Sequence, residues 1–159
     1  YKLLHNILPS LPVLHHINPN ISPSCGWCGE RGTVWHFFIL CPAVQSSLNL
    51  LHSLIVRLLP DLHISFDTYW ALIPHARRRS KEAVRLANYL IVSCKNVIYL
   101  LCRSCNFIDP LTIWKNRIKS HILLDLHYFK LTNQLNKFNN KWSINDTLFT
   151  LTHGEITWL

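Results

Sequence analysis

Apolar residues recur at helical spacing along two long stretches of this chain. The first runs from about residue 75 to residue 102, and its apolar positions lie three and four residues apart. The second begins with Asp109 as N-cap and Pro110 in the first turn, and ends near Asn136. The two apolar stripes are Val84, Ala87, Ile91, Cys94, Ile98 and Leu101, and Leu111, Trp114, Ile118, Ile122, Leu126 and Phe129. We expect two long helices, each burying one face.

Prolines divide the rest of the chain. The first 24 residues contain Pro9, Pro12, Pro19 and Pro23, which predicts an irregular, extended lead-in over residues 1–24. Pro42 suits the first turn of a third helix over residues 43–59, and Pro60 stops that helix. We assign residues 43–137 to a helical region. Residues 138–159 form a Thr-rich tail in which some alternation favours one or two short strands.

Between the lead-in and the helical region, residues 25–42 carry a Cys/His motif. Its spacing is C-x2-C-x7-H-x4-C, supplied by Cys25, Cys28, His36 and Cys41. Three thiolates and one imidazole complete a tetrahedral zinc shell, with no position left for water. Such a site is structural, because metal binding supplies folding energy to a segment too short to bury its own core. The alternative, buried cysteines and a core histidine, would require four ligand-type residues to fall within 17 positions by chance. The sequence predicts one structural Zn²⁺ and a mainly α fold: a small zinc unit, three helices and a short β segment.

Other groups admit a metal or packing interpretation. Cys102 and Cys105 form a second C-x2-C pair, which with Cys94 and His121 or His127 forms a second possible ligand set. Burial of Cys94 and a helix end at the other two cysteines is the simpler interpretation. Trp27, Trp35, Phe37 and Phe38 are candidates for base stacking or for packing around the zinc unit.

The Cys/His segment resembles a known family. Cys25 and Cys28, then Thr33 and His36 spaced T-x-x-H, and finally Cys41-Pro42 are similar to the zinc-binding C-terminal region of non-LTR (LINE-type) retrotransposon reverse transcriptases. More loosely, Trp70, the Arg-rich residues 77–79 before a long helix, and a Trp-x-x-Arg helix at Trp114 match the same region. The resemblance implies a segment at the C-terminal end of a polyprotein that helps hold element RNA or target DNA. It also implies the reverse transcriptase domain of the same polyprotein as a partner. Because Tyr1 is not methionine, we expect a downstream piece of a longer protein.

The charge is unevenly distributed. The net charge is +8 over 159 residues; residues 1–76 are neutral overall and residues 77–159 carry all of it. Such an excess favours a polyanionic partner over a merely basic surface. Our candidate phosphate contacts lie on two helices and are Arg77, Arg78, Arg79, Lys81, Arg85, Lys115 and Lys119.

Several function classes are disfavoured. Residues 32–56 lack Lys, Arg, Asp and Glu but contain dense polar side chains, and Lys95 interrupts residues 86–102, so we expect no membrane span. Polymerase chemistry needs closely paired carboxylates, and no two acidic residues are adjacent. Six cysteines are too few for a disulfide scaffold, which favours a reducing compartment, nucleus or cytoplasm.

We therefore expect a non-catalytic, zinc-binding and nucleic-acid-binding segment. Two alternatives stay open from the sequence: a module that docks on the missing polymerase domain, and a decayed retroelement fragment.

Overall fold

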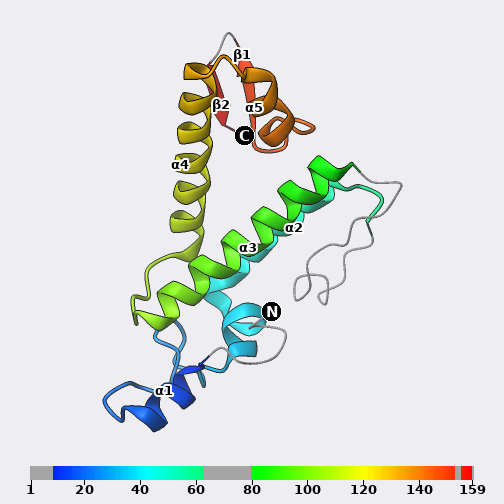
Figure 1. Ribbon diagram of the computed structural model, residues 1–159. Helices are drawn as coiled ribbons and strands as arrows, with labels where there is room; N and C mark the ends of the chain where they lie inside the picture. The colour runs from blue at the N-terminus through cyan, green and yellow to red at the C-terminus, as the bar shows by residue number, and fades with distance from the viewer. Residues whose placement is uncertain (1–8, 63–79, 153–154, 159) are drawn as a thin grey trace. The chain divides into compact units, whose positions relative to one another are not determined.

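The computed structural model describes residues 9–62, 80–152 and 155–158 and is mainly helical (Figure 1). A short antiparallel sheet near the C-terminus pairs β1 with β2, with Phe149 opposite Trp158. The elements are α1 (Leu11–Ile17), the π-helical turn η1 (His36–Leu40), α2 (Pro42–Leu58), α3 (Lys81–Arg103), α4 (Pro110–Leu131), α5 (Leu135–Trp142), β1 (Phe149–Thr152) and β2 (Glu155–Trp158). The predicted fold class is confirmed, with one helix more than expected after the Cys/His segment.

The chain divides into two compact units, each assembled from two stretches of sequence. The first combines Tyr1–Asn49 with Val92–Trp114, and the second combines Leu50–Ile91 with Lys115–Leu159. The linear division drawn from the sequence does not anticipate this interleaving. A helix of more than four turns is long enough to contribute different turns to different cores, so α2, α3 and α4 each belong to both units.

The predicted stripe of α3 is buried, and that of α4 is buried except at Leu111 and Phe129, which are of intermediate exposure. On α3, Val84, Ala87 and Ile91 are fully buried, and Cys94, Ile98 and Leu101 are at most 7% exposed. The beginning of α3 lies at Lys81; the earlier start that the spacing predicts, like Trp70, falls in residues 63–79, outside the described residues.

The predicted N-cap of α4 is confirmed. Asp109 accepts backbone N–H bonds from Leu111 (3.1 Å) and Thr112 (3.0 Å), so its carboxylate satisfies donors that the first helical turn leaves unpaired. One turn later, Trp114 is fully buried and donates its indole N–H to Ser93 Oγ at 2.8 Å. This hydrogen bond joins α3 and α4 inside the first unit.

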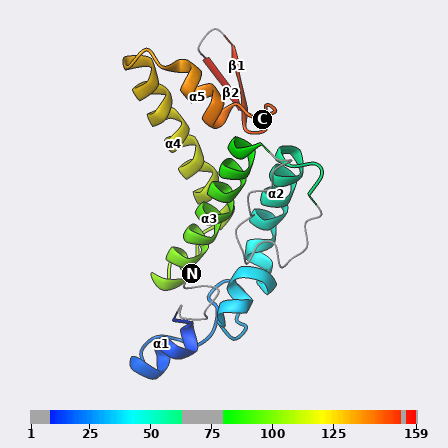
Figure 2. The ribbon, with the colours of Figure 1, turned by 45° about the vertical axis from the view of Figure 1, so that its right-hand side comes forward.

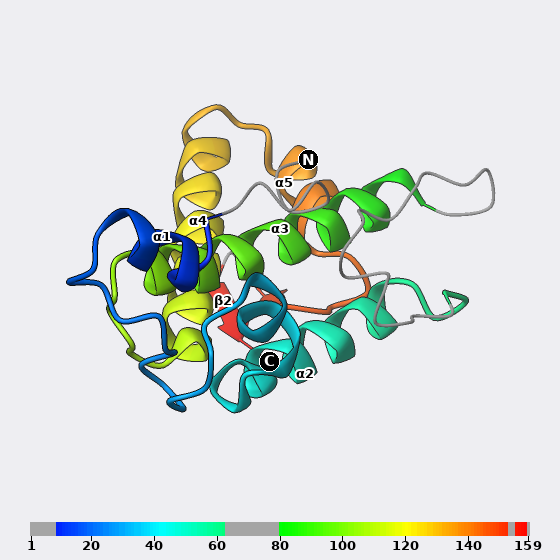
Figure 3. The same cartoon turned by 90° about the horizontal axis from the view of Figure 1, so that it is seen from below.

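The lead-in contains a helix, α1, where the prolines predict an irregular segment. Pro12 stands in the first turn of this helix, where its missing N–H costs nothing, so proline begins the helix rather than preventing it. Leu11 is 2% exposed and donates its backbone N–H to Gly32 O at 3.1 Å. Figure 3 shows α1 beside the C-terminal end of α3, where α1, η1 and α3 line one small cavity. This tertiary contact stabilises a helix too short to form alone.

The second long helix ends earlier than predicted, and α5 occupies the boundary that the sequence places at residue 137. Asn133 adopts φ +55°, and Gln134 N–H bonds back to Phe129 O at 2.8 Å. This left-handed residue followed by a backward bond is a Schellman-type helix end, which asparagine tolerates. The chain turns at this point and starts α5, which lies with the β1–β2 hairpin near the C-terminal half of α4 (Figure 2).

Asp125 ties α5 to α4 in the second unit. It accepts hydrogen bonds from Lys141 Nζ (2.6 Å) and from Trp142 Nε1 (2.7 Å), and Trp142 is 3% exposed. Partial burial of Asp125 opposes ionisation, but Lys141 and Trp142 outweigh it and hold the pKa of this carboxyl below its usual value.

Asp125→Asn should lower the free energy of unfolding of the chain by about 1–2 kcal/mol, because it removes charge-assisted bonds that are partly screened by water. A folded-state pKa below the unfolded one stabilises the protein above the unfolded pKa, and this contribution is lost as the pH falls through the folded pKa. The difference in free energy of unfolding between the wild type and Asp125→Asn should therefore shrink as the pH falls into the acid range. Urea titrations at neutral and acidic pH measure both effects; equal stabilities at neutral pH would contradict the role given to Asp125.

Among the helices that the structure describes, α3 is long and apolar enough to cross a membrane by length and composition. More than half of the relevant window is buried inside the structure, as in the core helix of a soluble protein.

Candidate metal centre

Cys25, Cys28, His36 and Cys41 converge in the first unit. Their ligand atoms all lie within 4.8 Å of one another. Cys41 Sγ is 3.8 Å from Cys25 Sγ and 3.9 Å from Cys28 Sγ, while Cys28 Sγ is 3.2 Å from His36 Nε2. The four side chains singled out by spacing therefore face a common point and can hold a metal ion.

Two sulfur–sulfur separations match a tetrahedral cation site. With metal–sulfur bonds of about 2.3 Å, the edge of a tetrahedron of sulfurs is about 3.8 Å. The two measured sulfur–sulfur separations agree with that edge. Three thiols and one imidazole are one of the donor sets that bind zinc in closed, four-coordinate sites.

A tight turn positions the first two ligands. Gly29 N–H donates to Cys25 O at 2.7 Å, and Cys25 N–H donates to Glu30 O at 2.6 Å. Gly29 takes φ +80°, a left-handed conformation that side chains with a Cβ rarely adopt. Because the chain reverses here, the sulfurs of Cys25 and Cys28 come to the same side.

The other two ligands sit at the ends of η1. Thr33 Oγ1 accepts the backbone N–H of His36 at 3.0 Å, which caps this turn and gives the T-x-x-H spacing a physical reason. The wide π-type turn closes with Cys41 N–H donating to His36 O at 2.8 Å. Pro42 then disfavours a helical conformation at Cys41, whose ψ is 124°, so η1 ends there and α2 begins.

Burial shapes the chemistry of these ligands. It raises the pKa of the Cys25 thiol and raises that of Cys41 to about 12. It also lowers the pKa of His36, against the opposing charge of Glu30. The imidazole is thus ready to coordinate as a neutral base, whereas the thiols must release protons when they bind a cation.

Trp27 secures the Cys/His segment to the loop after α3. Its indole N–H donates to Ile108 O at 3.1 Å, and its ring meets Phe107 edge-on at 5.2 Å. A side chain at Gly26 would overlap the Phe107 ring, so glycine is needed for this approach. Phe37 and Phe38 are 4% and 5% exposed, which favours packing over base stacking for these rings; Trp35 is 46% exposed.

The second Cys pair has a different environment. Cys94 and Cys102 are buried, and burial raises the pKa of both thiols, while Cys105 is exposed. In the described ranges, the Cys25–Cys41 group is the one cluster with metal-ligand geometry. His121 instead bonds Tyr89 Oη through Nδ1 at 2.6 Å. These observations favour the packing interpretation of Cys94 and Cys102.

The candidate phosphate contacts are only partly described. Arg77, Arg78 and Arg79 lie outside the described residues. Lys81, Arg85, Lys115 and Lys119 are all exposed on α3 and α4, and Lys119 Nζ lies 5.3 Å from the centre of the Trp158 ring. Lys141 and Tyr89 share a pocket with Arg85 but are not evident from the sequence pattern. The basic, aromatic composition of α5 was a signal for Lys141, and there was none for Tyr89 on α3.

A comparison with curated proteins finds one informative similarity. The chain is 26% identical over 152 residues to the "Transposon TX1 uncharacterized 149 kDa protein" of Xenopus laevis. The alignment covers 93% of this chain and 11% of that protein. The chain resembles a segment of a transposon protein. This similarity includes the helices beyond the Cys/His segment, since it extends along nearly the whole chain. No family model matches the chain, and no solved structure matches it.

Proposed function

We propose that this chain is a non-catalytic segment of a retrotransposon reverse transcriptase that binds one structural zinc ion and holds element RNA or target DNA. The Cys25–Cys28–His36–Cys41 cluster carries the proposal. Its four candidate ligands occur in a chain of which 93% aligns with a transposon protein. The fit to the zinc-binding C-terminal region of LINE-type enzymes is part of this proposal.

The donor chemistry supports zinc. A shell of three sulfurs and one nitrogen completes four-coordination, which leaves no place for a reacting water. The ion would hold the turn at Cys25 and η1 together, and through Trp27 it would fix the loop after α3. A reducing compartment, nucleus or cytoplasm, would keep the thiols available.

The charge supports a nucleic acid as partner. All of the net charge of +8 falls in residues 77–159, and the described lysines and arginine among the candidate phosphate-binding residues are exposed. Exposed cations that neutralise phosphates release counterions, so binding should weaken steeply with salt and depend little on base sequence.

A salt titration of binding tests this function. Log affinity falls linearly with log salt concentration, and each neutralised phosphate contributes about 0.7–0.9 to the magnitude of that slope. Replacing Arg77, Arg78 and Arg79 with glutamine should therefore reduce the magnitude of the slope by about two. Filter binding with single-stranded RNA and duplex DNA measures both proteins. An unchanged slope would contradict phosphate binding by these arginines, and an absence of binding by the wild type would contradict the function.

One observation favours a second candidate, a module that docks on the polymerase domain of the same polyprotein. Leu123, Leu124, Tyr128 and Leu131 on α4 are between 51% and 72% exposed. Neighbouring exposed apolar side chains are typical of protein interfaces. Copurification with an upstream segment of the parent protein, abolished by replacing Leu124 and Leu131 with serine, would support this candidate.

A further inference from the structure

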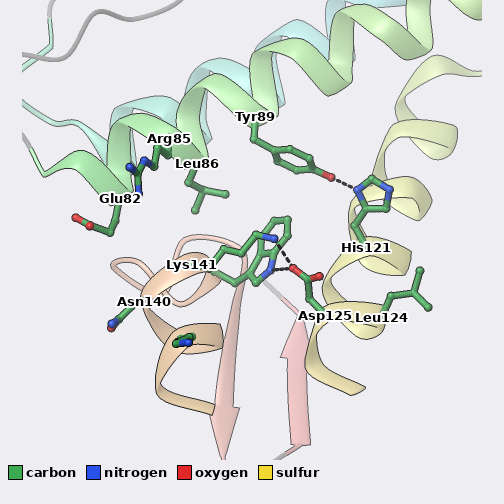
Figure 4. Close-up of a pocket in the computed structure, with 11 residues that line it drawn as sticks. Glu82, Arg85, Leu86, Tyr89, His121, Leu124, Asp125, Asn140 and Lys141 are labelled. Carbon is green, nitrogen blue, oxygen red and sulfur yellow. Dashed lines mark hydrogen bonds and ion pairs between the residues drawn. The ribbon is translucent and has the colours of Figure 1, made fainter. Parts of the chain in front are cut away.

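A pocket lies within the second unit, between the first half of α3, the middle of α4, and α5. Its volume is about 610 Å³, within the range of about 300–1,000 Å³ typical of small-molecule sites. Figure 4 shows Glu82 and Arg85 at one end of the pocket and His121 at the other. No residue of the Cys/His segment lines it, so the pocket is separate from the metal centre.

The pocket is lined by flat and apolar groups. Leu86 is 4% exposed, Trp142 is 3% exposed, and Tyr89 is of intermediate exposure. The Tyr89 and Trp142 rings meet edge-on, with centroids 5.2 Å apart at 88°. One ring therefore presents a face where the other presents an edge, which is an arrangement that can receive a planar ligand.

Polar contacts hold this lining in place. Trp142 donates to Asp125 at 2.7 Å, and Lys141 pairs with the same carboxylate at 2.6 Å. At the other side, Tyr89 Oη and His121 Nδ1 are 2.6 Å apart. Both aromatic rings are thus fixed by a partner on α4, so the pocket is formed before a ligand arrives.

Two exposed basic side chains are among the residues that line the pocket. Arg85 and Lys137 are exposed and line the pocket, from α3 and α5. In the part of the chain that the structure describes, neither side chain forms a hydrogen bond or an ion pair within 4 Å. Among the described residues that line the pocket, Glu82 is the one carboxylate that Lys141 does not engage, so the cations Arg85 and Lys137 exceed the remaining negative charge.

We infer that this pocket receives one unstacked nucleotide of a single-stranded nucleic acid, with the base against Tyr89 and the adjoining phosphates at Arg85 and Lys137. The inference rests on the proposed function and names a site for it. A base in a duplex is stacked on both faces and paired along its Watson–Crick edge, so only an unpaired strand can place one in a concave aromatic site. An apolar protein segment would fill the lining but leave the excess positive charge of Arg85 and Lys137 over Glu82 uncompensated, which is why we favour a polyanion.

The test uses the full chain and a labelled oligothymidine, with the matching oligothymidine–oligoadenine duplex as a second ligand. Tyr89→Leu should weaken binding of the single strand about tenfold, because it removes base stacking, and should leave duplex binding unchanged. Tyr89→Phe keeps the ring and should stay within about twofold of the wild type. Fluorescence anisotropy measures the affinities, and circular dichroism checks that each variant is folded.

Two double variants that remove the same number of positive charges test where the phosphates of the bound strand lie. Arg85→Gln with Lys137→Gln removes two pocket cations, and Lys115→Gln with Lys119→Gln removes two cations of α4 that do not line the pocket. Photocrosslinking with thiothymidine in the oligonucleotide should label peptides containing Tyr89 or Trp142 in the wild type and should be abolished in the pocket variant. The α4 variant should lose affinity, because Lys115 and Lys119 are candidate phosphate contacts, but should keep the crosslink. Both pocket residues are exposed, so this variant tests the site even if Tyr89→Leu does not fold.

The outcomes separate the two levels of the proposal. Single-strand binding that is unchanged in both pocket variants, with crosslinks elsewhere, overturns the pocket and leaves nucleic-acid binding standing. Equal losses of affinity in the pocket and α4 variants, without a pocket crosslink, indicate general electrostatics and also overturn the pocket. A wild-type chain that binds neither ligand overturns the proposed function and this inference with it.

Discussion

Cys28→Ser should release the metal and unfold the segment from Cys25 to Cys41. Serine is a poor zinc ligand, and the remaining three donors leave the ion open to water. In small zinc domains the metal contributes about 10 kcal/mol or more of folding free energy, and this segment is too short to replace that contribution with a core of its own. Wild-type protein purified without chelator should contain about one equivalent of zinc by atomic emission, and the variant almost none.

Cys105→Ser is the matched control for this loss. Cys105 is also an exposed cysteine of a C-x2-C pair, but it lies outside the four-residue cluster. Its replacement should leave the zinc content and the proton release on metal binding unchanged. Full zinc content in Cys28→Ser would show that the ligand assignment is wrong, and a loss of zinc in Cys105→Ser would point to the second cysteine pair.

Trp114→Ala should be the most damaging single change among the helices of the first unit. The side chain is fully buried, and its indole N–H bonds Ser93 Oγ at 2.8 Å. Truncation to alanine removes a large apolar surface, leaves a cavity and removes the hydrogen bond to Ser93, at a cost of about 3–5 kcal/mol. Urea unfolding followed by circular dichroism measures the decrease in stability.

Two variants separate packing from the hydrogen bond at this position. Trp114→Phe keeps most of the volume and removes the N–H, so its cost should be much smaller than that of Trp114→Ala. Trp35→Ala removes the same side chain where it is 46% exposed, and should also cost much less. If Trp114→Ala were no more destabilising than Trp35→Ala, the buried packing between α3 and α4 would be contradicted.

The site that four residues of the Cys/His segment form was predictable because its geometry is local. The turn after Cys25 needs a glycine at position 29, and the cap at Thr33 lies three residues before His36. Each feature depends on neighbours within a single turn, which the order of residues specifies directly. The same holds for the Asp109 cap and for the buried stripe of α3, since helical spacing fixes which side chains share a face.

The helices α1 and α5, which depend on contacts with distant residues, could not be predicted from the sequence. The helix α1 forms although it contains Pro12, because the backbone N–H of Leu11 bonds to Gly32 O. The helix α5 begins after α4 ends at Asn133, whose left-handed conformation allows the chain to turn. Their short segments have weak intrinsic preferences, so interactions elsewhere in the chain decide their conformation.

The sequence by itself determined the candidate metal-ligand set, the helical class and the basic character of residues 77–159. Only the tertiary structure brought Arg85, Tyr89 and Lys137 to one pocket, and only it divided three continuous helices between two units. The physical reason is the same in both cases. The helical spacing of apolar residues indicates which face of a helix is buried. Which element covers that face depends on packing between helices that are far apart in sequence.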